Sequence, residues 1–161
     1  MLGILILTSG LKFVLGHVAG AFFLYFNHRF VFHGSLGRLP ILRNFRMLHS
    51  LHHKHSETPD RNDFLKIPVW GLLLISLLLV TLLLIDGWMG LGVISFALLY
   101  SYRHYSIHNG GKKTHFSVHH MIHHRFPKYN FSGVYPAIDK LFGTNAEFRI
   151  YGSATKRRSL R

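Results

Sequence analysis

The chain has 161 residues, no cysteine and a formal net charge of +13, although 48% of its residues are hydrophobic. Without thiols it forms no disulfide, thiolate metal site or cysteine nucleophile. Its six carboxylates include no Glu-x-x-His pair, which excludes the glutamate-rich di-iron bundle of soluble proteins. A high apolar content with a strong basic charge favours a body in lipid with a basic face, and a nucleic-acid partner is not expected.

The first apolar segment covers residues 2–26 and is interrupted by Lys12 and His17. Either the membrane segment begins at residue 2 and Lys12 reaches towards an interface, or Lys12 marks the far interface and the helix occupies 13–32. Because the apolar run continues far past Lys12, an uncleaved anchor is favoured over a cleavable signal. His17 is expected to be a packed, hydrogen-bonded residue rather than a ligand.

Two groups of histidines follow this segment, with the spacings H-x-x-x-x-H and H-x-x-H-H. They are His28 and His33, then His49, His52 and His53. Positions i, i+3 and i+4 share one face of a helix, so the second group can point at one place. The first pair is separated by roughly 140° on an ideal helix and converges only if the helix bends or ends. A basic amphipathic helix beginning near Pro40 is expected to carry the second group at the membrane interface.

A longer apolar run covers residues 67–85 and contains no charge. At about 1.5 Å per residue, a helix of this length spans roughly 28 Å, enough for a bilayer core. Residues 86–90 (Asp-Gly-Trp-Met-Gly) predict an interfacial turn, and 91–102 form a second apolar run. The two runs together predict a helical hairpin that ends in an H-x-x-x-H pair, His104 and His108.

The last group has the spacing H-x-x-H-H and comprises His120, His123 and His124. It is expected on a helix over about 114–125 that Pro127 terminates. His115 and His119 share a helical face with His123, so the sequence leaves open whether one of them replaces His120.

The distribution of positive charge predicts the orientation. Of 19 Lys and Arg residues, only Lys12 falls on the predicted outer side, so all four histidine groups should face the cytoplasm of a multi-pass membrane protein. The predicted fold is all-α: a single domain, 1–161, forming an integral membrane bundle of about three transmembrane helices with a cytoplasmic-face helical cap. Its parts are membrane helices at 1–33, 67–85 and 88–105, a cap at 36–66 and 106–151, and a basic tail at 152–161.

Ten imidazoles exceed the four to six ligands that one transition-metal ion takes, and they suit two ions that share a cage. One H-x-x-x-H pair arises often by chance, but four groups at helical spacings on one membrane face favour metal binding. The predicted ligands are His28, His33, His49, His52, His53, His104, His108, His120, His123 and His124. No catalytic residue beyond these ligands is expected, and the sequence assigns no substrate-binding residue.

These four groups, in this order, resemble the histidine boxes of the fatty acid hydroxylase/sterol desaturase superfamily, the membrane-bound di-iron oxygenases. The resemblance covers residues 27–144 and includes two later segments, Pro-Lys-Tyr-Asn-Phe at 127–131 and Asp-Lys-Leu-Phe-Gly-Thr at 139–144. Many relatives have four membrane helices and some carry an electron-donor domain, whereas here three crossings and no donor domain are expected. The compact size is similar to that of bacterial carotenoid hydroxylases, but the Leu-Phe-Gly-Thr ending favours the fatty acid and sterol branch.

The resemblance implies an O₂-dependent hydroxylase that inserts oxygen into a C–H bond of a fatty acyl, sterol or related lipid. It implies two Fe ions as cofactors, with Zn as an alternative occupant of purified protein because imidazole binds Zn more tightly. Electrons would come from a separate acidic donor, a b-type cytochrome or ferredoxin, drawn to the basic face. The alternatives are a lipid desaturase or carotenoid hydroxylase on the same cage, or a non-enzymatic membrane protein that binds metal or heme.

Overall fold

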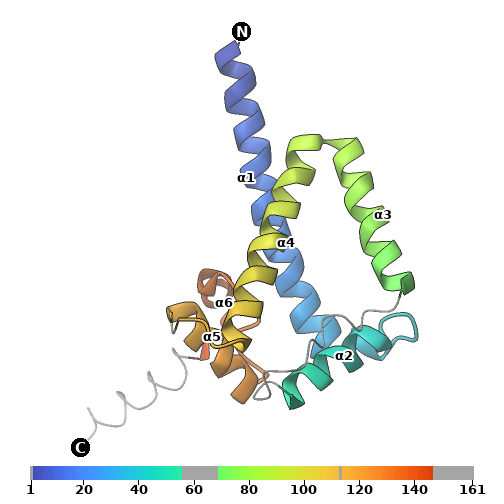
Figure 1. Cartoon of the computed structure of the whole chain (residues 1–161), viewed down its shortest axis with the longest axis vertical. Helices are drawn as coiled ribbons and strands as arrows, with labels where there is room; N and C mark the ends of the chain where they lie inside the picture. Colours follow the sequence, from blue (N-terminus) through green and yellow to red (C-terminus); the bar gives the residue numbers. More distant parts are fainter. Residues whose placement is uncertain (1, 56–68, 113, 147–161) are drawn as a thin grey trace, which may run out of the picture.

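The computed structural model describes residues 2–55, 69–112 and 114–146, and these residues form helices and connecting turns without any strand. Figure 1 shows the long helices extending from the end of the molecule at which the shorter helices gather. In chain order the elements are α1 (Leu2–Phe26), the π-helix η1 (Asn27–Phe32), the 3-10 helix η2 (Leu36–Arg38), α2 (Arg43–Lys54), α3 (Val69–Ile85), α4 (Gly87–His108), α5 (His115–Arg125) and α6 (Pro136–Leu141).

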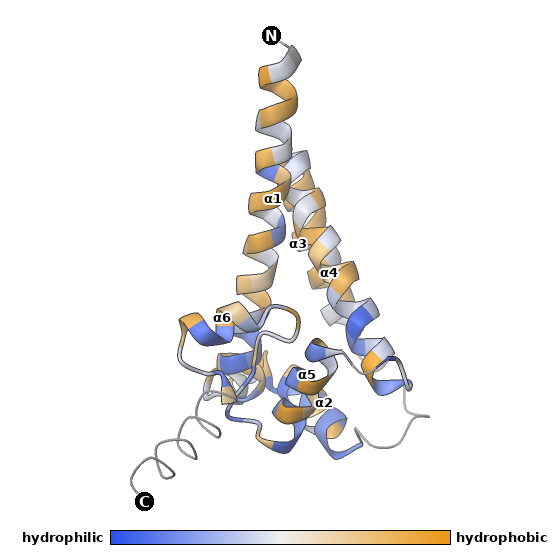
Figure 2. Ribbon diagram, turned by 90° about the vertical axis from the view of Figure 1, so that its left-hand side faces the viewer, coloured by the Kyte–Doolittle hydropathy of each residue, from blue (hydrophilic) through white to orange (hydrophobic). Residues whose placement is uncertain are grey.

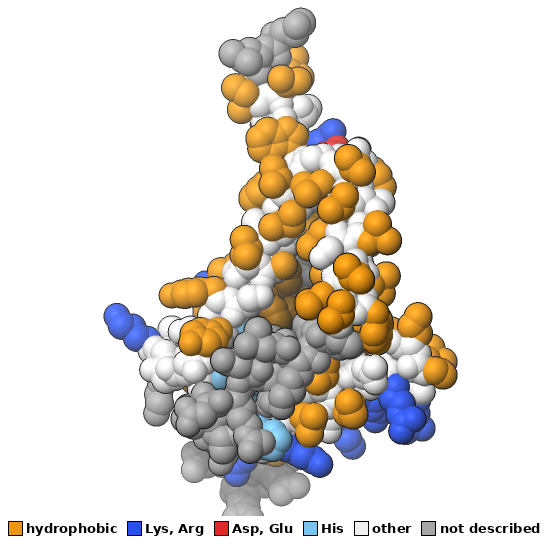
Figure 3. All heavy atoms as spheres, turned by 45° about the vertical axis from the view of Figure 1, so that its right-hand side comes forward, with side chains coloured by type: hydrophobic (Ala, Val, Ile, Leu, Met, Phe, Trp, Pro, Cys, Tyr) orange, Lys and Arg blue, Asp and Glu red, His pale blue; other side chains and the backbone are white. Residues whose placement is uncertain are grey.

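The long helices are apolar and the opposite end of the molecule is polar. Figure 2 shows hydrophobic residues along α1, α3 and α4 and hydrophilic residues concentrated near α2 and α5. Among the described residues, one helix is long and apolar enough to cross a membrane, Gly3–Phe32, whereas Val69–Ile85 is apolar but shorter. Their large apolar side chains are exposed, and in Figure 3 they cover the long helices while Lys and Arg side chains gather at the other end.

Helices α1 and α4 cross at a close contact made by glycine. A Cβ atom on Gly16 would collide with the backbone carbonyl of Met89, and one on Gly92 would collide with that of Phe13. Small residues at such crossings let two helix backbones approach without a side chain between them. The crossing therefore fixes the position of the end of α1 relative to the end of α4.

Lys12 lies at the end of the hairpin formed by α3 and α4. Its Nζ atom is 2.6 Å from Oδ2 of Asp86, whose other oxygen caps α4 by accepting a hydrogen bond from the backbone N–H of Met89 at 3.1 Å. The chain before Lys12 extends beyond this turn in Figure 1. The helix that is long and apolar enough to cross a membrane, Gly3–Phe32, includes Lys12, so both interpretations of this segment stay predictions.

The π-helix η1, which follows α1, reduces the angle around the helix axis between His28 and His33. The backbone N–H of His33 donates to the carbonyl of His28 at 3.1 Å, which is the i to i+5 bond of a π turn. This wider turn brings residues five apart to one side of the helix. The sequence expectation of a bend or an end was therefore close, but the widened turn itself was not foreseen.

The short helices begin and end at recognisable signals. Thr114 caps α5 in a reciprocal capping box with Ser117, which confirms the predicted helix over about 114–125. The prediction that α2 begins at Pro40 was wrong by three residues: Leu39 is extended, as expected before proline, and a turn precedes Arg43. Helix α4 also continues to His108, past the predicted end at residue 105.

Candidate metal centre

The structure brings all ten predicted histidines together at the polar end of the molecule. They form two groups of five, and within each group one ring nitrogen per residue lies within 4.8 Å of the others. The first cluster is His28, His33, His49, His53 and His123, and the second cluster is His52, His104, His108, His120 and His124. Either set of donors could hold a metal ion, whereas the sequence had predicted one shared cage without this division.

The division follows the geometry of the helix. In each H-x-x-H-H group, the two residues four apart enter one cluster and the residue between them enters the other. Thus α2 gives His49 and His53 to the first cluster and His52 to the second, and α5 gives a pair to the second cluster and His123 to the first. Residues i and i+4 lie one above the other on a helix, while i+3 points to the other side of that line.

Hydrogen bonds to two backbone carbonyls define which nitrogen faces the first cluster. Nδ1 of His28 donates to the carbonyl oxygen of Phe131 at 2.6 Å, and Nδ1 of His123 donates to that of Tyr129 at 2.6 Å. A carbonyl only accepts, so each Nδ1 carries the proton and each Nε2 presents a lone pair to the cluster. This is the tautomer that a metal-ligating imidazole requires.

The spacing of the inward nitrogens fits a common ion. Nε2 of His28 is 3.1 Å from Nε2 of His49, and that of His33 is 3.1 Å from that of His123. In the second cluster, Nε2 of His120 is 3.0 Å from that of His108 and 2.9 Å from that of His124. Two imidazole nitrogens bound at right angles to one ion, each at about 2.1 Å, lie about 3 Å apart.

The two clusters are adjacent. The ring centroids of His53 and His124 are 4.4 Å apart, and those of His52 and His53, neighbours that serve different clusters, are 6.0 Å apart. Two ions, one in each cluster, would therefore be surrounded by one continuous set of imidazole rings. This juxtaposition is what a dinuclear site requires and what two isolated sites would lack.

Burial keeps imidazoles of both clusters neutral. It lowers the pKa of His33 to about 4 and that of His123 to about 3, with positive charge on His53 and Arg46 adding to the effect at His33. Burial likewise lowers the pKa of His49 and of His120 well below the ordinary value of 6.5. Neutral rings at pH 7 offer a free lone pair, which is the form that binds a metal.

The remaining histidines lie outside both clusters. His17 contacts Ser95 Oγ through Nδ1 and Tyr135 Oη through Nε2, each at 2.7 Å, as expected for a packed residue. His119 points away from the centre towards Asp139, and exposed His115 packs on Phe116. The geometry thus places His120 in the second cluster, and it places neither His115 nor His119 in a cluster.

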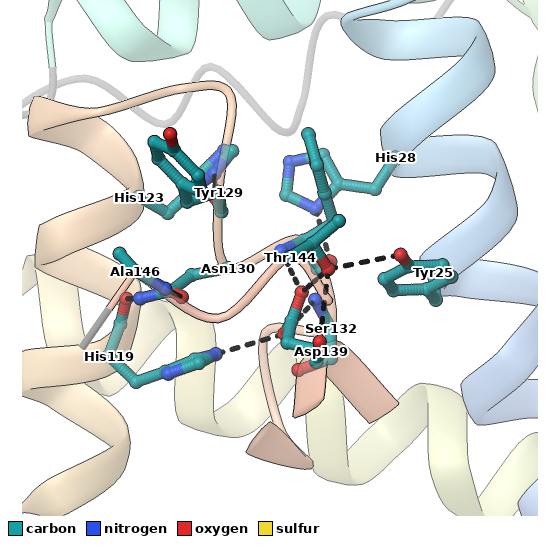
Figure 4. Close-up of polar contacts among 11 residues, drawn as sticks. Tyr25, His28, His119, His123, Tyr129, Asn130, Ser132, Asp139, Thr144 and Ala146 are labelled. Carbon is teal, nitrogen blue, oxygen red and sulfur yellow. Dashed lines mark hydrogen bonds and ion pairs between the residues drawn. The ribbon is translucent and has the colours of Figure 1, made fainter. Parts of the chain in front are cut away.

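A loop from the C-terminal part of the chain supports the first cluster, and sequence reasoning gave it no role. Figure 4 shows residues 129–132 between His28, His123 and the buried carboxylate of Asp139. Backbone carbonyls carry no sequence signal, so the contacts of Tyr129 and Phe131 could not be predicted. The Asp-Lys-Leu-Phe-Gly-Thr segment at 139–144 contributes only to the family resemblance in the sequence analysis. It is the one sequence motif that points to a role for Asp139.

A cavity of about 430 Å³ opens beside the first cluster. His33 and Phe131 line the side next to the cluster, and Arg29 and Lys128 supply positive charge. Arg29 is held in place by a 2.9 Å hydrogen bond to Tyr25 Oη. The basic residues between 38 and 54, which are Arg38, Arg43, Arg46 and Lys54, do not line this cavity.

An all-helical chain with two adjacent five-histidine clusters at the end of an apolar helix defines the class of histidine-box proteins. The chain belongs to the fatty acid hydroxylase family, whose model matches residues 13–144. This membership supports an enzyme that hydroxylates or desaturates lipids, in a family that generally uses iron. No curated protein and no solved structure matches the chain.

Proposed function

We propose that this protein is a membrane-embedded, dinuclear lipid hydroxylase with one metal ion in each histidine cluster. The observation that supports it most directly is the division of ten imidazoles into two adjacent sets of five. Two iron ions held there would supply O₂ activation. One oxygen atom enters a substrate C–H bond, and the other leaves as water after uptake of two electrons and two protons from outside the chain.

The side chains of this protein hold and orient the centre rather than reacting themselves. Neutral imidazoles bind the ions, and the carbonyls of Tyr129 and Phe131 fix the rings of His123 and His28. The apolar exteriors of α1, α3 and α4 support a bundle of three membrane crossings, with the clusters on the cytoplasmic face according to the charge distribution. A lipid can then approach from the bilayer without leaving it.

The cavity beside His33 is the proposed site for the polar head of the substrate. Arg29 and Lys128 at this cavity suit an acidic head, and Phe30 and Phe131 provide apolar walls. Lys128→Gln should raise KM for a lipid with an acidic head without changing metal content. Arg43→Gln, an exposed cation on α2 outside the cavity, is the matched control.

The function is tested by expression in a host of defined lipid composition, followed by mass spectrometry of the lipids. Hydroxylation adds 16 mass units and desaturation removes 2, so the product separates the two reactions that the same centre supports. Metal analysis of the purified chain should give about two ions. A Soret absorption band, or a carrier-like single exchangeable ion with no lipid product, would contradict the proposal in favour of the non-enzymatic alternative.

A further inference from the structure

Asp139 is a fully buried carboxylate that lies outside both clusters. Its Oδ1 accepts hydrogen bonds from the backbone N–H of Phe131 at 2.8 Å and the hydroxyl of Thr144 at 2.7 Å. Its Oδ2 accepts from the backbone N–H of Ser132 at 2.9 Å and from Nε2 of His119 at 3.0 Å. Both oxygens are therefore used twice, and Figure 4 shows the carboxylate at the centre of this network.

The hydrogen bonds keep this carboxylate charged although it is buried. Burial alone raises the pKa of Asp139, but the contacts with His119, Ser132 and Thr144 outweigh it and bring the pKa below its ordinary value. A buried negative charge is costly unless it is compensated by such donors. The network is thus built to hold an anion next to the loop.

One peptide unit connects this anion to a ligand of the first cluster. The amide N–H of Ser132 donates to Asp139, and the carbonyl of Phe131, the other end of the same peptide group, accepts from Nδ1 of His28 at 2.6 Å. A carboxylate on the N–H polarises the peptide and strengthens its carbonyl as an acceptor. The arrangement is equivalent to a carboxylate–histidine pair with a peptide group inserted between the partners.

A second peptide unit holds His123, although its N–H donates to a backbone carbonyl instead of to the carboxylate. The carbonyl of Tyr129 accepts from His123, and the N–H of Asn130 donates to the carbonyl of Thr144 at 2.9 Å. Asn130 has a positive φ of 58°, in the left-handed region that asparagine adopts more readily than most residues other than glycine. Its side chain bonds the backbone of His119 and of Ala146, at 3.0 and 2.8 Å. The loop is therefore fixed from several sides.

We propose that Asp139 is a positioning residue for the first cluster: it fixes His28 through the peptide group between Phe131 and Ser132, so that metal affinity at the first cluster depends on its carboxylate while the second cluster retains its ion. The inference rests on the proposed dinuclear function. It follows from the fact that both loop carbonyls are used by ligands of the first cluster.

The test compares Asp139→Asn with the unchanged chain, purified at full length in lipid nanodiscs. Asparagine has the same size but presents N–H donors where Asp139 accepts bonds at both oxygens. We expect roughly 10–100-fold weaker binding of one of the two ions in a chelator competition, read as a fall from about two ions per chain to about one. Asp86→Asn, at the other end of α4, should keep both ions.

Thr144 gives an independent pair of variants should Asp139→Asn be recovered in too small an amount. Thr144→Val removes the hydroxyl that donates to Asp139 at nearly constant volume, whereas Thr144→Ser keeps it. The valine variant should weaken one ion and the serine variant should restore it. Equal loss of both ions, or retention of both in Asp139→Asn and Thr144→Val, overturns the inference alone. A wild-type chain without metal contradicts the proposed function as well.

Discussion

The two histidine clusters follow one design rule but differ in what supports them. Each cluster contains two pairs of histidines, and the members of a pair lie one helical turn apart. Its fifth histidine comes from an H-x-x-H-H group whose other two members belong to the opposite cluster. In the second cluster both pairs, His104 with His108 and His120 with His124, lie on regular α-helix. In the first cluster one pair, His28 with His33, is closed by a π turn and is held from outside by a loop.

This difference teaches where the centre is robust and where it is vulnerable. A regular helix places residues i and i+4 together by local geometry alone, so the second cluster needs little beyond the correct contact of three helices. The first cluster also needs a widened turn, an attribute common at functional sites, and a segment more than one hundred residues away along the chain from His28. We therefore expect damage at distant positions to reach the first cluster before the second.

The largest effect should come from the two single residues that each cluster receives from the opposite group, His52 and His123. His52→Ala should remove the ion of the second cluster and His123→Ala that of the first. Lipid hydroxylation should fall at least ~100-fold in each variant, because even replacing a residue that only hydrogen-bonds to a metal ligand lowers metal affinity or activity 10–100-fold. Metal counting and lipid mass spectrometry measure both results. Exposed His115→Ala is the control and should change neither; a normal product yield from either cluster variant would refute the two-ion centre.

The next effect concerns the crossing of α1 and α4, which determines the position of one cluster relative to the other. Gly16→Leu places a side chain against the backbone of Met89, where relaxation is difficult, and should destabilise the fold by about 1–3 kcal/mol. Gly10→Leu, on the same helix with no atom within 4 Å of its added Cβ, should have little effect. Thermal unfolding in nanodiscs measures both, and comparable stability of the two variants would show that the α1–α4 contact is not tight.

The regular parts of this molecule were predictable because their signals are local. The spacings of His104 and His108 and of the two H-x-x-H-H groups fix which residues share a helical face, and Thr114 with Pro127 bounds α5. The ten residues that the structure gathers are the ten predicted from spacing. Their role as ligands remains a prediction.

The irregular parts were not predictable for equally physical reasons. The π turn depends on a single hydrogen-bond shift that no residue type encodes, and the support of His28 and His123 comes from backbone carbonyls. The division of each H-x-x-H-H group between clusters was in principle readable from the i+3 offset of His52 and His123, but it requires knowing that two such helices face each other.

Acid should destabilise the metal-free fold through the buried imidazoles of both clusters. In the folded chain burial lowers the pKa of His33 to about 4 and that of His123 to about 3, and it holds the pKa of His120 and His124 in the second cluster well below the ordinary value. As pH falls from 6.5, the unfolded chain takes up protons on these residues first, so the metal-free fold loses stability progressively towards pH 4. Thermal unfolding of the metal-free chain should show a midpoint that falls across this range; a midpoint independent of pH would contradict the burial of these rings as neutral imidazoles.

The smallest effect concerns what the clusters share, the basic surface at their end of the molecule (Figure 3). If an acidic donor supplies electrons, attraction between the two surfaces should raise its encounter rate, and salt should reduce that attraction because the screening length falls from about 10 Å at 0.1 M to about 3 Å at 1 M. Turnover with a reduced b-type cytochrome or ferredoxin should therefore slow several-fold over this range. Turnover driven by dithionite, a small reductant that does not dock through this surface, is the control for any effect of salt on the centre itself. Equal salt sensitivity with both reductants would place the effect at the clusters rather than at donor docking.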